Sequence, residues 1–107
     1  MSFTLHDLAA VIDARAAAAD GESSYTKKLL DKGAVHCAKK FGEEAVEAVI
    51  AAVDDDRADL INESADVLFH LLVLLKSRDV ALDEVEAALG ERTRMSGLQE
   101  KASRKSD

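Results

Sequence analysis

Two long, largely apolar segments, residues 34–53 and 57–77, are separated only by the three aspartates at positions 54–56. The chain contains no proline, one tyrosine, three phenylalanines and no tryptophan. This composition favours helices over a sheet built from β-branched and aromatic strands. A short connection between two long helices makes them antiparallel neighbours. We therefore predict an all-α fold, a bundle of about five helices that forms a single domain over residues 1–107.

Capping residues and apolar spacing predict the other elements. Thr4 and Asp7 form a capping pair, Ser24 precedes a short helix, and an aspartate of the triplet caps the fourth helix. The predicted helices span residues 5 to about 19, 25–32, 34–53, 57–77 and 82 to about 92. Gly33 allows a change of direction, and a charged, serine-rich tail that starts near residue 96 is predicted to be flexible.

Composition also argues against several classes of partner. The formal net charge of -7 disfavours binding to nucleic acid, because that binding relies on lysine and arginine. The single cysteine, Cys37, cannot form an intrachain disulfide and is predicted to be a small buried thiol. No apolar run approaches the roughly twenty residues of a membrane span, and the N-terminus lacks a signal-peptide pattern. We expect a cytoplasmic protein without membrane partners.

Carboxylates interrupt the two apolar segments at helical spacing. Glu44 and Glu47 lie one turn apart in the first segment, and Glu63 and Asp66 lie one turn apart in the second. Two antiparallel helices can bring these four side chains to one point. Like charges at such a point repel, and their burial is costly, unless a cation offsets both effects. The pattern predicts a metal site.

Oxygen-only ligands select a hard cation, so we expect Mg²⁺, with Mn²⁺ as a possible substitute. Magnesium commonly shares its coordination with substrate phosphates, which indicates phosphate-ester or phosphoanhydride chemistry. The competing interpretation is a set of exposed salt bridges to nearby Lys39, Lys40 and Arg57. A di-iron site would need histidine three residues after glutamate in both motifs, and neither has it. His70 is interpreted as a hydrogen-bonded core residue or as a group that orients a carboxylate or a water.

Longer motifs carry a family resemblance. The segments E-A-V-E at 44–47 and E-S-A-D at 63–66 resemble the ExxE and ExxD motifs of the all-α nucleoside triphosphate pyrophosphohydrolases. Within that superfamily, S-Y-T at 24–26, K-F-G-E-E at 40–44 and S-G-L-Q-E-K-A at 96–102 are similar to the phosphoribosyl-ATP pyrophosphohydrolases of histidine biosynthesis.

The resemblance implies Mg²⁺-dependent hydrolysis of 1-(5-phosphoribosyl)-ATP to 1-(5-phosphoribosyl)-AMP and pyrophosphate. It implies four metal ligands, Glu44, Glu47, Glu63 and Asp66. It also implies that Ser24, Tyr25 and Thr26 line the substrate pocket, although the residues alone predict a helix cap at Ser24 and a core anchor at Tyr25. Glu43 is our candidate for the catalytic base or for a residue that supports a metal ligand, with one of the four ligands as the alternative base. Lys40 is our candidate phosphate contact, with a helix salt bridge to Glu44 as the alternative.

Two rival functions follow from the same sequence. A related pyrophosphohydrolase would act on dUTP, dCTP or damaged nucleotides, whereas a noncatalytic helical module would only bind partners. The paired acidic motifs favour an enzyme. Because residues 71–75 are apolar on all sides of their helix, we also expect a homodimer that completes the core.

Overall fold

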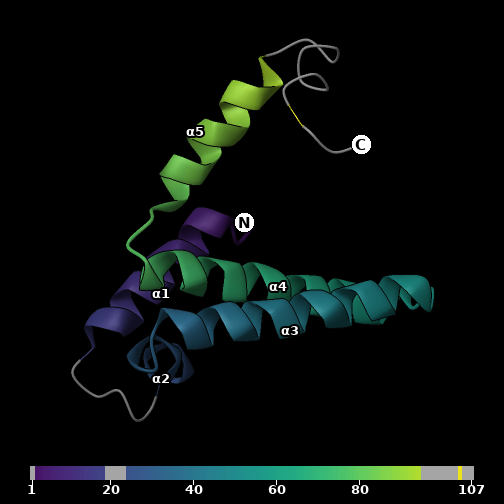
Figure 1. Cartoon of the computed structure of the whole chain (residues 1–107), viewed down its shortest axis with the longest axis horizontal. Helices are drawn as coiled ribbons and strands as arrows, with labels where there is room; N and C mark the ends of the chain where they lie inside the picture. Colours follow the sequence, from purple (N-terminus) through teal and green to yellow (C-terminus); the bar gives the residue numbers. More distant parts are fainter. Residues whose placement is uncertain (1, 19–23, 95–103, 105–107) are drawn as a thin grey trace.

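The computed structural model describes residues 2–18, 24–94 and 104, and this part of the chain contains helices and no strands (Figure 1). The helices are α1 (Leu5–Ala17), α2 (Tyr25–Asp31), α3 (Ala34–Val53), α4 (Arg57–Ser77) and α5 (Leu82–Thr93). The all-α prediction with about five helices is confirmed. None of these helices combines the length and apolar character needed to cross a membrane. The predicted tail from residue 96 falls almost entirely outside the described residues.

Side-chain caps set the starts of three helices. The Thr4 hydroxyl accepts a hydrogen bond from the Asp7 N–H at 3.1 Å, while the Asp7 carboxylate accepts one from the Thr4 N–H at 2.9 Å. Ser24 accepts from the Lys27 N–H at 3.1 Å, and Asp56 caps α4. Each such cap stabilises a helix by about 1 kcal/mol. The predicted caps are confirmed.

The end of α1 differs from the prediction, whereas α5 begins at Leu82 as predicted. Helix α1 ends at Ala17, because Ala18 already has an extended backbone, so the predicted end near Ala19 was too late. At the start of α5, Ala81 offers no side-chain acceptor, and the Glu84 carboxylate accepts from the Ala81 N–H at 3.0 Å instead. Only half of a capping box therefore holds this helix start.

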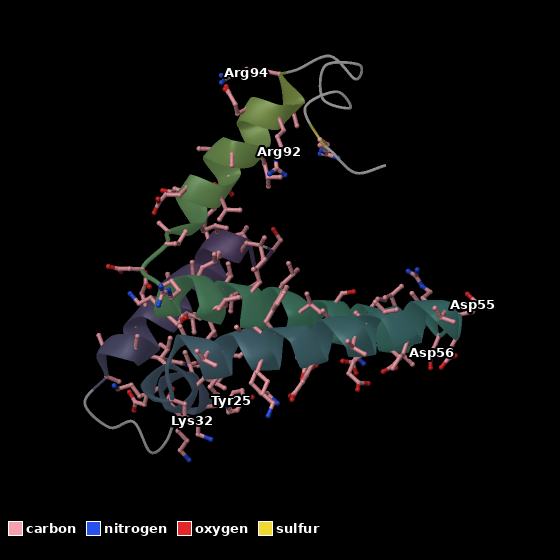
Figure 2. The ribbon with its side chains drawn as sticks, viewed as in Figure 1. Tyr25, Lys32, Asp55, Asp56, Arg92 and Arg94 are labelled. Atoms are coloured by element: carbon pink, nitrogen blue, oxygen red, sulfur yellow. The ribbon has the colours of Figure 1, made fainter. Side chains whose placement is uncertain are left out.

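Helices α3 and α4 form a long antiparallel hairpin that dominates the molecule (Figure 1). Asp54 ends α3, Asp55 takes a left-handed backbone with φ 57°, and Asp56 accepts from the Asp59 N–H at 3.0 Å. Aspartate is among the few residues that tolerate the left-handed conformation. The triplet is thus the tight turn and cap that the sequence predicts, and it forms the tip of the hairpin (Figure 2).

The core lies at the opposite end of the hairpin, where α1 and α2 pack on α3 and α4 (Figure 1). Its buried members come from all four helices: Ile12, Leu29, Cys37, Leu72 and Val73. The Cys37 thiol donates to the Leu29 carbonyl at 3.3 Å, and burial raises the pKa of Cys37. The predicted buried thiol is confirmed.

Toward the tip, the hairpin leaves apolar side chains in solvent. Val49 is 60% exposed and Ile61 is 56% exposed, and the other large exposed side chains of this region are Val46, Ile50, Val53, Leu60 and Leu68. Within one chain, most of the residues from 45 to 53 are therefore exposed. The uncovered apolar surface also lies on residues 46–68, not on residues 71–75, because α1 and α2 cover much of that later part of α4.

Candidate metal and phosphate site

Three carboxylates meet where α3 and α4 face each other in the middle of the hairpin. One oxygen from each of Glu44, Glu63 and Asp66 lies within 4.8 Å of the other two. Glu44 and Glu63 are half-buried, and Asp66 is exposed at the edge of the group. The antiparallel packing brings Glu44, the first glutamate of the α3 motif, against both acidic residues of the α4 motif, so three of the four carboxylates meet as the helical spacing predicts.

The surroundings of Glu63 show how unfavourable this grouping is for charged side chains. Partial burial raises the pKa of Glu63, and the neighbouring charges of Asp59, Asp66, Glu44 and Glu47 raise it further. A carboxyl group with a raised pKa is destabilised in its ionised form. A divalent cation among the same oxygens would instead stabilise the ionised carboxylates and lower their pKa.

Glu47 and Glu43 lie outside the group of three. Glu47 is exposed, one turn beyond Glu44, yet its charge still acts on Glu63. Glu43 accepts an ion pair from Lys40 at 3.3 Å, and the side-chain hydrogen bond of this pair is the main cause of the raised pKa of Lys40. The structure therefore pairs Lys40 with Glu43, whereas the sequence-based alternative paired it with Glu44.

His70 lies one turn after Asp66 on α4 and is 5% exposed. Burial lowers the pKa of His70, and Lys40 lowers it further against the opposing effect of Glu44. Its Nδ1 atom has no hydrogen-bond partner among the described residues. Burial in the core agrees with one of the two sequence-based interpretations, but the hydrogen bond that it assumed at the ring is not found at Nδ1.

The S-Y-T segment occupies the start of α2 beside this site. The Ser24 hydroxyl serves as the helix cap, and Thr26 is buried with no partner for its Oγ1 atom among the described residues. Tyr25 is 55% exposed, so the expectation of a core anchor is wrong. Its ring stacks on Phe69 at 6.2 Å between centroids and meets His70 edge-on at 6.1 Å. Tyr25 thus forms a wall beside the buried imidazole.

Next to Tyr25 lies a pocket of about 500 Å³ that the sequence analysis did not identify. It is lined by Tyr25, Lys28, Leu29, Lys32, His36 and Lys40, together with Asp31. The sequence signal for this pocket was a basic residue at every fourth position, at Lys28, Lys32, His36 and Lys40. This interval places the four side chains on one side of two consecutive helices. Gly33 separates those helices, so their relative direction was not available from spacing alone.

A second group of possible metal ligands joins α1 to α5. The His6 Nε2 atom lies 2.9 Å from a Glu86 oxygen, and its Nδ1 atom lies 3.7 Å from Asp83. All three residues are exposed. These contacts tie α5, which otherwise projects from the bundle, to the first helix (Figure 1).

Comparison with known proteins identifies the relatives of this chain. The model of the family described as "Phosphoribosyl-ATP pyrophosphohydrolase" matches residues 5–93. "Phosphoribosyl-ATP pyrophosphatase 1" of Rhodopseudomonas palustris is 78% identical over 105 residues, which cover 98% of this chain and 97% of the relative. "Phosphoribosyl-ATP pyrophosphatase" of Nitrobacter hamburgensis is 67% identical over 95% of this chain and 94% of its own length. The chain belongs to the phosphoribosyl-ATP pyrophosphohydrolase family.

Proposed function

We propose that this chain hydrolyses 1-(5-phosphoribosyl)-ATP to 1-(5-phosphoribosyl)-AMP and pyrophosphate, a step of histidine biosynthesis. Family membership and the high identity to phosphoribosyl-ATP pyrophosphatases support this activity. The structural observation that carries the proposal is the convergence of Glu44, Glu63 and Asp66 between α3 and α4. Such a group is suited to a cation-assisted reaction at a phosphoanhydride.

Magnesium fits the residues present. The donors are all carboxylate oxygens, which suit a hard cation, and the raised pKa of Glu63 reflects a charge crowding that a cation would relieve. We propose Glu44, Glu47, Glu63 and Asp66 as the residues that hold Mg²⁺, with Mn²⁺ as a substitute. When bound, the ion would neutralise phosphate charge and acidify a water molecule.

The chain's own side chains have separate roles in this proposal. Lys40 lies one turn before Glu44, and its ammonium group would exchange its contact with Glu43 for a phosphate oxygen. That exchange would leave the Glu43 carboxylate without its ammonium partner and able to accept a proton from the attacking water. The segment Ser24, Tyr25 and Thr26 would form the wall of the substrate pocket, through the exposed ring of Tyr25 above all.

We further propose that the protein is a cytoplasmic homodimer. The exposed apolar residues of α3 and α4 form a surface near the tip of the hairpin, and burial of such a surface favours association. A second hairpin offers a matching apolar surface. Because the acidic group lies on the same two helices, dimerisation would also enclose the site more fully.

A nucleotide panel tests the activity. Purified protein with Mg²⁺ should release pyrophosphate from phosphoribosyl-ATP much faster than from dUTP, dCTP or ATP. Release only from a free nucleoside triphosphate would move the activity to a related pyrophosphohydrolase. No release from any of them would support a noncatalytic helical module and contradict the proposal.

A further inference from the structure

We propose that the pocket between α2 and α3 binds the 5-phosphate of the phosphoribosyl group and so distinguishes phosphoribosyl-ATP from free ATP. The inference rests on the proposed function, because it concerns a second part of the same substrate. The pocket has a volume of about 500 Å³, and Lys28, Lys32, His36 and Lys40 contribute to its lining. We call this pocket, with its four basic lining residues, the basic pocket.

The charge of the basic pocket is opposite to that of the protein. The chain carries 21 acidic and 14 basic side chains, yet three lysines line this one pocket. Lys28 and Lys32 lie one turn apart at the end of α2, a spacing at which like charges destabilise a helix. A bound anion would offset that repulsion.

Two lysines of the basic pocket, Lys28 and Lys32, are not engaged in ion pairs within the described part of the chain. Asp31 is the one carboxylate in the lining, and it accepts an ion pair from Lys27 at 3.0 Å. Neither Lys28 nor Lys32 forms an ion pair with any residue that the structure describes. Figure 2 shows Tyr25 at the start of α2 and Lys32 just after its end, both well away from the acidic tip at Asp55 and Asp56. The two ammonium groups are thus free to bind a ligand.

The basic pocket adjoins the acidic group through Lys40 and Tyr25. Lys40 lines the pocket and also lies one turn from Glu44, whose charge acts on it. Tyr25 lines the pocket on one side and contacts the ring of His70 on the other. A ligand in the pocket would therefore lie beside a nucleotide held at the carboxylates.

The chemistry of the substrate assigns this pocket to one phosphate. Phosphoribosyl-ATP carries a triphosphate and, on its second ribose, a separate phosphate monoester. The carboxylates and their cation suit the triphosphate, whereas a phosphate away from the cation needs positively charged side chains. Free ATP lacks that second phosphate, so lysines that bind it favour phosphoribosyl-ATP over ATP.

Replacement of both free lysines tests the inference. In the double variant Lys28→Gln and Lys32→Gln, we expect the KM for phosphoribosyl-ATP to rise about tenfold or more, with kcat changed less than about twofold. Inhibition of the reaction by ATP should stay unchanged, because ATP does not reach the basic pocket. Lys39→Gln is the matched control, since it removes an exposed lysine of α3 outside the pocket lining.

Each other outcome has a definite meaning. An unchanged KM in a folded, active double variant would overturn the inference and leave the proposed function intact. If the double variant bound phosphoribosyl-ATP and ATP more weakly by the same factor, the triphosphate would lie in the pocket, and this result would also overturn the inference. A wild-type protein inactive on phosphoribosyl-ATP would instead contradict the proposed function. Circular dichroism of each variant separates loss of binding from loss of folding, and Lys28→Arg with Lys32→Arg should restore most of the affinity because both charges return.

Discussion

Burial and the neighbouring negative charges both raise the pKa of Glu63. Partial burial raises the pKa of this carboxyl group above its ordinary value of 4.5, and four neighbouring carboxylates add to the effect. A raised pKa in the folded state means that folding favours the protonated form. In the metal-free protein, the contribution of Glu63 to the free energy of unfolding is therefore fully present below about pH 4.5 and is lost as the pH rises through the raised pKa of Glu63.

Removal of the Glu63 charge tests this pH dependence. With a chelator present, Glu63→Gln should raise the melting temperature at neutral pH, and the difference from wild type should shrink toward zero below about pH 4.5. Thermal unfolding measured at several pH values checks this. Asp55→Asn removes one charge at the distant hairpin tip and should show no such pH-dependent gain. A Glu63→Gln protein that is less stable than wild type at neutral pH would contradict the charge-crowding argument.

Individual residues were predictable where a local rule decides their position. The helical spacing was enough to place Glu44, Glu63 and Asp66 on facing surfaces, and short side-chain caps identified Thr4 and Ser24. Tyr25 was not predictable in the same way. Its exposure depends on how α2 packs against Phe69 of α4, and that contact is set by tertiary structure.

At the level of elements, the turn between α3 and α4 controls the register of the acidic group. Asp56 accepts from the Asp59 N–H at the start of α4. Its replacement by alanine should lower stability by about 1 kcal/mol through loss of the cap. Chemical denaturation measures this change. Asp54→Ala, at the end of α3, has no such cap to lose and should cost clearly less; an equal loss in both variants would argue against the capping role.

The same level shows why some boundaries could be predicted and others could not. Both bounds of α3 and of α4 agree with the sequence, because Gly33, the aspartate triplet and the polar residues after Ser77 mark them. Helix α1 ends inside a run of alanines, the best helix formers, so its sequence contains no stop signal. The basic pocket depends on the angle between α2 and α3 across Gly33, whose φ of 98° no periodicity encodes.

For the whole molecule, the exposed apolar surface near the hairpin tip predicts self-association. Wild-type protein should sediment as a dimer at micromolar concentration, because Val49 and Ile61 are more than half exposed in one chain. The double variant Val49→Lys and Ile61→Lys should shift toward monomer. Val35→Lys is the control, since Val35 is 87% exposed but lies at the start of α3, far from the tip. A wild-type monomer would contradict the dimer proposal.

The proposed cation-dependent hydrolysis is tested most directly by the rate of pyrophosphate release from phosphoribosyl-ATP as Mg²⁺ is titrated. We compare wild type with Glu44→Gln, which keeps the size of the side chain and removes one of the three converging charges. We expect release by wild type to require the cation, and Glu44→Gln to lower the rate by about a hundredfold or more. Release without a divalent cation, or an unchanged rate and Mg²⁺ dependence in Glu44→Gln, would contradict this proposal.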